Sequence, residues 1–307
     1  MSEFWGVSAA ILWSALGGTS IVATRYVVGA TDPLTLGAFR CGIGFAFLVV
    51  IALLQGGSWP RRQDWLAVAG LGLLWFGLFP ILFNASLMYT TAARGALALA
   101  TAPLLTLIVS AMCGAEALTG RKLVGVLVAM VGVAIALLAR LSDGPETEGA
   151  WSGDLLMIGA ALCLAISNVW SKPLVRRSGP LQFTSVMMGS GSLVLIAISW
   201  ARGGFSAAYQ FDMSQWLAVL YLGIIGSAVT FYLWAFALRR TTPTAVAVSV
   251  TVNPIVASLM GVLLLNEVLR WNLVVGLIAV CAGIAIAVTS GSSPSTANLV
   301  LERSKSP

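Results

Sequence analysis

The sequence contains no histidine and carries few charges. Only 9% of its 307 residues are Asp, Glu, Lys or Arg, whereas 59% are hydrophobic. A soluble domain carries about 25% charged residues, and a soluble fold of this length could not cover so much apolar surface. Apolar runs recur along the whole chain, and a run of about 20 residues can cross a bilayer as a helix. The sequence therefore predicts an integral membrane protein.

Two other patterns are missing. A closed transmembrane barrel alternates apolar and polar residues, whereas the run LVGVLVAMVGVAIALLA at 123–139 does not alternate. No disulfide framework or metal site is indicated, because all four cysteines fall inside apolar runs and suit small core positions; they are Cys41, Cys113, Cys163 and Cys281. We therefore expect an all-α membrane protein without a metal or another cofactor.

The shortage of acidic residues restricts the chemistry further. No Asp or Glu falls at mid-depth in any expected span, and intramembrane carboxylates and histidines are the usual parts of a proton relay. Intramembrane enzymes need a nucleophile with a base, paired carboxylates or a metal. We therefore expect a protein that is not an enzyme, and facilitated diffusion or exchange in place of transport through a midplane proton carboxylate.

We expect ten spanning helices and cytoplasmic termini. Eleven of the 17 Lys and Arg residues lie on the N-terminal side of these spans and six on the other side, which by the positive-inside rule places that side in the cytoplasm of a bacterial inner membrane. The N-terminus does not read as a cleaved signal, and the tail 290–307 is predicted to be disordered. The expected spans are 4–28, 34–54, 65–89, 94–115, 122–140, 153–175, 181–201, 215–238, 243–265 and 271–289.

The chain repeats itself at a shift of 151 residues. Trp65 then meets Trp216. The other matched positions include Pro103 with Pro254, Glu116 with Glu267, Gly125 with Gly276 and Gly132 with Gly283. Five spans per copy is an odd number, so the copies are inverted, as in many secondary transporters. We expect repeats at 1–140 and 153–289, joined by an extracytoplasmic loop at 141–152.

Prolines inside the spans are candidate gates. Pro103 and Pro254 lie within spans four and nine, where a proline removes a backbone hydrogen bond; the carbonyls affected would be those of Leu99 and Val250. A static kink that serves packing is the alternative. Pro80 has the same reading with less weight, because its partner in the second copy is not a proline.

The two repeated glutamates are expected to have a structural role. Glu116 and Glu267 end their spans near the interface, so we expect hydrated carboxylates that pair with basic neighbours or end the helix. Arg40 and Arg94 are expected to snorkel to the outer interface, with contact to a carboxylate as the alternative. Small residues along spans five and ten predict close helix packing.

Neutral polar and aromatic residues at depth describe a candidate cavity. Each alone is more often interhelical packing than ligand contact, but together they suit a small, partly apolar, neutral or zwitterionic solute. The candidates are Trp13, Gly17, Ser20, Thr24, Trp75, Phe79, Phe83, Asn84, Thr101, Ser167, Asn168, Ser227, Tyr232, Trp234, Ser249 and Asn253.

Ten spans in two copies, with proline-plus-glutamate segments in spans four and nine, resemble the drug/metabolite transporter superfamily, EamA branch. The finer likeness is to amino-acid exporters of the YddG type. The matching residues are Pro103 with Glu116 and Pro254 with Glu267. The resemblance implies a central cavity built by spans one, three, four, six, eight and nine, with spans five and ten outside, and export of amino acids or related metabolites.

The expected function is secondary export of amino acids of broad specificity, including aromatic and apolar ones, by alternating access. Export of other small metabolites or drugs on the same fold is the alternative. A receptor or scaffold would leave the inverted repeat unexplained. We expect small-molecule substrates and membrane lipid as partners and no nucleic acid, with monomer and homodimer both open.

Overall fold

The structure, a computed structural model, describes residues 2–27, 31–86, 89, 98–141, 150–253, 255–256, 259–260 and 271–288. The described part consists of helices and their connections. In chain order the main helices are α1 (Ser2–Val27), α2 (Pro33–Gln55), α3 (Trp65–Gly72), η2 (Leu73–Leu78), α4 (Phe79–Ser86), α6 (Ala102–Met112), α7 (Gly120–Leu141), α8 (Ala150–Arg177), α9 (Pro180–Ala201), α10 (Met213–Gly223), η4 (Ile224–Val229), α11 (Thr230–Arg240), α12 (Pro243–Ser249) and α14 (Trp271–Val288).

A described helix overlaps each of the ten predicted ranges. Among the described residues, five helical stretches are long and apolar enough to cross a membrane, and shorter apolar helices lie at Ala102–Met112 and Val274–Ala287; the five are Pro33–Gln55, Arg62–Phe83, Trp151–Arg177, Pro180–Ala201 and Met213–Arg240. The prediction of an all-helical membrane architecture is confirmed at this level.

Local sequence explains where several helices begin. The Asp32 side chain accepts hydrogen bonds from the first backbone N–H groups of α2, and Asp212 forms a capping box with Gln215 at the start of α10. The Thr242 hydroxyl caps α12 by accepting a hydrogen bond from the Ala245 backbone N–H. Such side chains satisfy N–H groups that have no partner inside the helix. Helices α2, α9 and α12 also carry proline in the first turn, where a missing N–H costs little.

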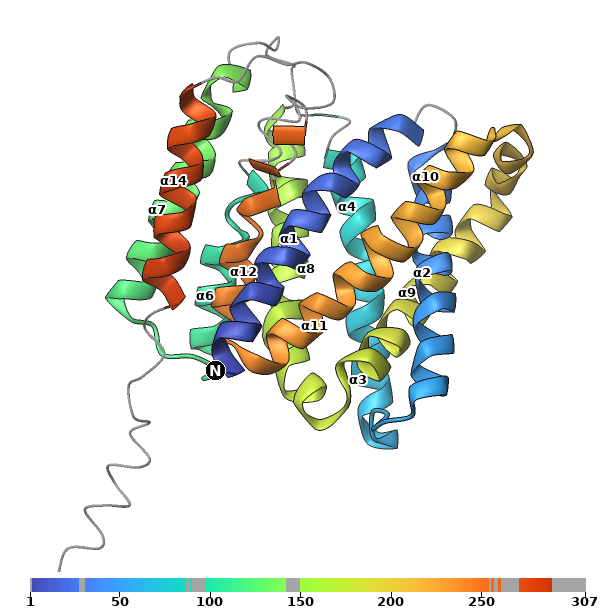
Figure 1. The fold of residues 1–307 in the computed structure, drawn as a ribbon, viewed down its shortest axis with the longest axis horizontal. Helices are drawn as coiled ribbons and strands as arrows, with labels where there is room; N and C mark the ends of the chain where they lie inside the picture. The colour runs from blue at the N-terminus through green and yellow to red at the C-terminus, as the bar shows by residue number, and fades with distance from the viewer. Residues whose placement is uncertain are drawn as a thin grey trace, which may run out of the picture.

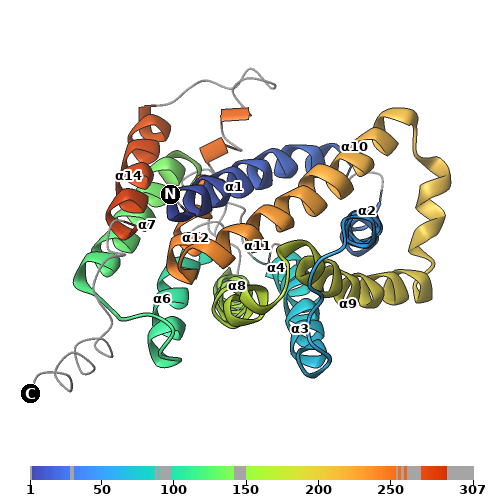
Figure 2. The same ribbon diagram turned by 60° about the horizontal axis from the view of Figure 1, so that its bottom comes forward.

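Helices α7 and α14 form a pair at one edge of the bundle (Figure 1). Glycines let their backbones touch: a methyl group on Gly132 would lie 2.9 Å from the Gly276 carbonyl oxygen, and one on Gly283 would lie 2.6 Å from that of Gly125. The predicted close packing of these helices is confirmed. The remaining helices build the body of the bundle, where α1 packs on α11, α8 on α4 and α2 on α9 (Figures 1 and 2).

Two π-helical segments lie at matching positions. Segment η2 spans Leu73–Leu78 and segment η4 spans Ile224–Val229, so their ends differ by the same 151 residues as the sequence repeat. A π-turn inside an α-helix is rare and often marks a functional site. Pro80 follows η2, but Phe231 occupies the matching place after η4. Proline is therefore not the common cause of the two segments.

The glycine before each π-segment packs against a neighbouring helix. A methyl group on Gly72 would overlap the Met187 backbone of α9, and one on Gly223 would lie 2.5 Å from Cγ2 of Ile43 in α2. The partner helices repeat the pattern: Gly191 closely approaches the Gly72 carbonyl, and Gly44 approaches that of Gly223. The same set of contacts thus occurs twice, at positions related by shifts of 151 and 147.

Candidate functional site

Both helices that carry the repeated prolines are interrupted. Residues 100–101 form a turn before α6, which places Pro103 in the first turn of that helix. The predicted kink inside a continuous helix is therefore wrong for Pro103, because the chain breaks just before it. Residues 250–251 form a turn after α12, one residue before the place that the shift of 151 gives, while Pro254 lies outside the described residues. At each turn a threonine hydroxyl donates to the carbonyl oxygen three residues earlier. Thr101 donates to Ala98 and Thr251 to Val248, each at 2.6 Å.

The second break frees a different carbonyl from the one predicted. The Asn253 N–H bonds the Val250 oxygen at 3.0 Å, so the Val250 carbonyl keeps a partner and the Ser249 carbonyl loses the donor it would have in an α-helix. Ser14 of α1 replaces that donor, with its hydroxyl 2.5 Å from the Ser249 carbonyl oxygen and 2.8 Å from Asn253 Oδ1. The break is thus stabilised by a helix more than 200 residues away in sequence.

Close approach of α1 brings three predicted residues together. A methyl group on Gly17 would lie 3.0 Å from Asn253 Oδ1, so Gly17, Asn253 and Ser249 meet around Ser14. Ser14 itself was not among the predicted residues. Its signal in the sequence is weak: one hydroxyl three residues before Gly17 and on the same helix face.

A second polar cluster lies between α8 and α11. The Trp234 indole N–H donates to Asn168 Oδ1 at 2.9 Å, and the Trp75 ring packs on Trp234 with centroids 4.7 Å apart. Three polar atoms of α8 are buried without a hydrogen-bond partner: Ser167 Oγ, Asn168 Nδ2 and Ser171 Oγ. Buried polar groups are normally paired, so these three atoms are candidates for contact with a substrate.

Aromatic rings continue from this cluster along one face of η2 and α4. Trp75 packs on Phe79 at 6.5 Å between centroids, and Phe79 stacks on Phe83 at 5.8 Å. Phe231, from the other copy, meets Trp75 edge-on at 5.9 Å. Rings at such separations attract each other beyond simple burial. These rings form a contiguous series, and their place in the wall of a substrate cavity stays a prediction.

Arg40 contacts the second π-segment, contrary to the expectation that it snorkels. Its guanidinium donates to Ser227 Oγ at 2.7 Å and to the Gly226 carbonyl oxygen at 2.6 Å, both in η4. The expected place at the interface is wrong, because the π-segment supplies acceptors inside the bundle. Ser20 lies at the same contact, since a methyl group on Gly226 would meet its hydroxyl. Arg94 lies outside the described residues.

The candidate residues differ in exposure. We define the N-terminal face as the end of the bundle formed by the start of α1, the 56–64 loop and the 178–179 and 241–242 turns (Figure 1). The partly exposed candidates are Gly17, Thr24, Phe79, Phe83, Thr101, Tyr232 and Asn253. The buried candidates include Trp13 (5% exposed), Trp75 (4%), Asn168 (0%), Trp234 (0%) and Ser249 (0%).

The other candidates have varied surroundings. Tyr232 is half-buried against Phe236, with ring centroids 6.1 Å apart. The side chain of Asn84 and the whole of Glu267 lie outside the described residues. Among the residues that the structure describes, no three His, Cys, Asp or Glu side chains gather as a metal site would require. Assignment of the candidates to a substrate cavity remains a prediction.

Glu116 joins the two copies at the N-terminal face. Its Oε2 accepts a 2.6 Å bond from Lys122, and its Oε1 accepts one of 2.9 Å from the Thr244 backbone N–H at the start of α12. The expected pairing with a basic neighbour is confirmed. The expected hydration is wrong, because the Glu116 side chain is only 3% exposed once it holds both donors. Nearby, the Lys172 ammonium group donates to the Thr241 carbonyl oxygen at 2.6 Å.

Substitution of Glu116 separates these two roles. Glu116→Gln keeps an acceptor for the Thr244 N–H but loses the ion pair, whereas Glu116→Ala loses both. Breaking a buried pair by removing one partner costs about 3–5 kcal/mol, so both variants should unfold more readily in thermal denaturation of the purified protein. Alanine should cost about 1 kcal/mol more, the worth of one further hydrogen bond. Equal stability of all three proteins would contradict the contact.

The comparisons with known proteins agree with this architecture. The EamA-like transporter family matches residues 3–138 and again residues 151–289. A solved crystal structure of a protein 22% identical in sequence superposes with a TM-score of 0.76 over 99% of each chain. That likeness bears on the fold alone.

Curated relatives span nearly the whole chain. The uncharacterized transporter YcxC of Bacillus subtilis is 26% identical over 287 residues, covering 90% of each chain. The uncharacterized inner membrane transporter YedA of Escherichia coli K12 is 28% identical over 269 residues, covering 84% of this chain and 81% of the relative. A probable terminal-alkyne amino-acid exporter of Streptantibioticus cattleyicolor is 25% identical over 263 residues, covering 85% and 86%. The chain is a multi-pass membrane protein that belongs to the EamA-like transporter family.

Proposed function

We propose that the protein is a secondary transporter that exports amino acids, including aromatic and apolar ones, across the bacterial inner membrane by alternating access. Two inverted five-helix copies would provide the two access states, with both termini in the cytoplasm. Inverted copies can exchange conformations, so that outward-open and inward-open states have similar energies.

The matched interruptions carry the mechanistic part of the proposal. A turn at 100–101 precedes α6 and a turn at 250–251 follows α12, each a few residues in sequence from a repeated proline. Broken helices at a repeat interface typically form the substrate site of a transporter. The π-segments η2 and η4, at the repeat shift of 151, support two equivalent bending points. The double match of the family along the chain supports the same division.

The unpaired polar atoms of α8 support the cargo. Asn168 Nδ2 is a buried donor without a partner, beside the rings of Trp75 and Trp234. An amide donor and serine hydroxyls suit a carboxylate or another small acceptor, and the rings suit an apolar or aromatic side chain. The amino-acid exporter among the relatives supports this cargo. Export of other small metabolites or drugs is the alternative.

Flux into liposomes tests the proposal. Purified protein should take up several radiolabelled amino acids, with phenylalanine and leucine among them, in a saturable way and without an imposed ion gradient. Protein-free liposomes of the same lipid measure leakage.

Other results would change the conclusion. Flux that begins only with a proton gradient would contradict the argument from missing midplane carboxylates. If no amino acid moved under either condition while an uncharged drug-like solute did, the cargo would be the alternative one. Absence of any flux, with the protein folded by circular dichroism, would contradict a transport role.

A further inference from the structure

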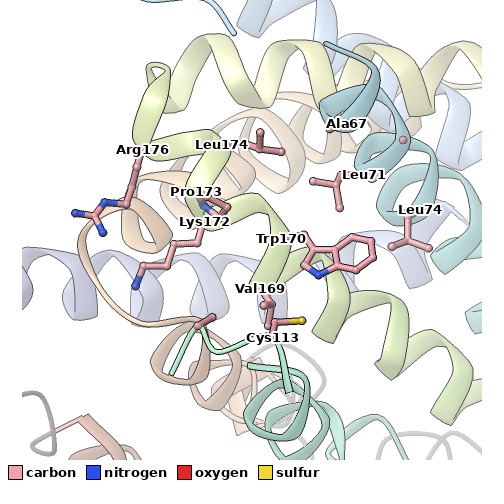
Figure 3. A pocket seen from close by; sticks show the side chains of 12 residues that line it. Ala67, Leu71, Leu74, Cys113, Val169, Trp170, Lys172, Pro173, Leu174 and Arg176 are labelled. Carbon is pink, nitrogen blue, oxygen red and sulfur yellow. The ribbon is translucent and has the colours of Figure 1, made fainter. Parts of the chain in front are cut away.

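A crevice of about 880 Å³ lies between α3, the end of α6 and the last turns of α8 (Figure 3). Sites that bind molecules of drug size have volumes of about 300–1,000 Å³. The wall of the crevice on α8 is formed by residues between Val169 and Arg176, and Asn168 is not among the lining residues. The crevice therefore needs an occupant of its own.

The surface around the crevice is apolar. Leu71 and Leu74 of the α3 side line it, and the large ring of Trp170 stands 54% exposed within it. On the helices beside it, Leu66 is 87% and Met112 is 81% exposed. Exposed apolar side chains of this size on a membrane protein suit contact with lipid tails, which favours a lipid as the occupant of the crevice.

One end of the crevice is basic. Lys172 and Arg176 line it four residues apart on α8, a spacing that places both on the same helix side. Figure 3 shows both side chains on one side of the crevice, away from Leu71 and Leu74. Lys172 is held by its bond to the Thr241 carbonyl, and none of the described lining residues is acidic.

We propose that this crevice binds one anionic glycerophospholipid from the leaflet at the N-terminal face. Its phosphate contacts Arg176 and Lys172, and an acyl chain lies along Trp170, Leu71 and Leu74. A basic pocket between membrane helices suits an anionic headgroup. A free phosphate would leave the apolar walls uncovered, and a neutral lipid would bring no net negative charge to the basic end. The proposal does not depend on the cargo.

Native mass spectrometry of the detergent-purified protein tests this site. The wild type should retain one phosphatidylglycerol under conditions that remove phosphatidylcholine. Arg176→Gln should weaken phosphatidylglycerol retention about fivefold, the effect of one cation near a lipid surface. Arg177→Gln is the matched control: it removes the same charge one residue later, from a side chain that pairs with Asp64 at 3.7 Å and does not line the crevice. The control should behave as the wild type does.

A second variant tests the apolar part without touching a charge. Gly70 lines the crevice, and a side chain there would meet no atom within 4 Å at its Cβ. Gly70→Leu should therefore fold and fill the crevice, lowering retention of the lipid. Gly120→Leu adds the same side chain at another glycine with open space around it and outside the crevice, and it should retain the lipid.

Each contrary result overturns the proposal. Equal retention of the two lipids by the wild type would exclude recognition of the headgroup. Unchanged retention in Gly70→Leu would place the lipid elsewhere. Displacement of phosphatidylglycerol by glycerol phosphate alone would show a phosphate site that does not need the acyl chain. Failure of glycerol phosphate to displace it is the expected result.

Discussion

Alanine at Gly72 is expected to destabilise the protein strongly, although it adds only one methyl group. The added carbon would overlap the Met187 backbone oxygen in α9, and a backbone atom cannot rotate away as a side chain can. Helices α3 and α9 must then separate. Overpacking of this kind costs about 1–3 kcal/mol and occasionally more, and we expect a cost at the upper end of that range. It should appear as a lower thermal unfolding midpoint of the purified protein.

Gly70→Ala is the matched control, two residues earlier on the same helix. No atom lies within 4 Å of its new methyl group, and replacing glycine by alanine inside a helix stabilises it by about 0.5–1 kcal/mol. The two substitutions should therefore move the midpoint in opposite directions. Gly223→Ala should also destabilise the protein, because its new methyl group would lie 2.5 Å from Cγ2 and 2.7 Å from Cβ of Ile43, and the backbone fixes the position of Cβ. A common small effect of all three would show that the α3–α9 contact is absent.

Asn168→Leu is expected to lower amino-acid flux at least about tenfold, a change worth about 1.4 kcal/mol. The substitution keeps a similar volume but removes both the acceptor for the Trp234 indole N–H and the unpaired Nδ2 donor. It also leaves the buried indole N–H without a partner, at a cost of about 1–3 kcal/mol. Flux into liposomes and thermal unfolding, measured on the same preparation, report the two consequences separately.

The double variant Asn168→Leu with Trp234→Phe distinguishes a structural role from a binding role. Phenylalanine removes the orphaned N–H, so stability should recover in part. Flux should stay low if Nδ2 contacts the substrate, whereas recovery of both would reduce Asn168 to a support for Trp234. Asn272→Leu provides the control for a buried amide elsewhere: Asn272 of α14 donates to the Ile135 carbonyl at 3.3 Å, outside the α8 cluster. It should leave flux unchanged.

Much of the fold could be predicted because it depends on local pattern. Apolar runs separated by turn residues located the helices, since each span must satisfy its backbone within itself in a lipid environment. Trp65 with Trp216, and Pro103 with Pro254, indicated the shift of 151, at which η2 and η4 are also related. The type of these segments was not predicted, because a π-turn leaves no distinct residue pattern in IIGSAV or LLWFGL.

The site depended on partners that are distant in sequence. Ser14 was missed because its role is to donate a hydrogen bond to the Ser249 carbonyl oxygen. That oxygen lacks its helical donor only because the helix ends there. Arg40 was assigned to the interface because a lone arginine in an apolar run normally snorkels, whereas η4 offers it two acceptors. Glu116 was expected to be hydrated because the start of α12, which covers it, lies 128 residues further along the chain.

The sequence by itself determined the membrane class, the positions of the helices and the repeated register, because composition and spacing act within each span. The tertiary structure decided which polar groups are satisfied and which remain unpaired. That distinction arises only when α1, α8 and α11 pack together and exclude water, so that each buried donor must find an acceptor within the protein. Asn168 Nδ2, Ser167 Oγ and Ser171 Oγ remain without one, and for that reason they carry the proposed substrate contact.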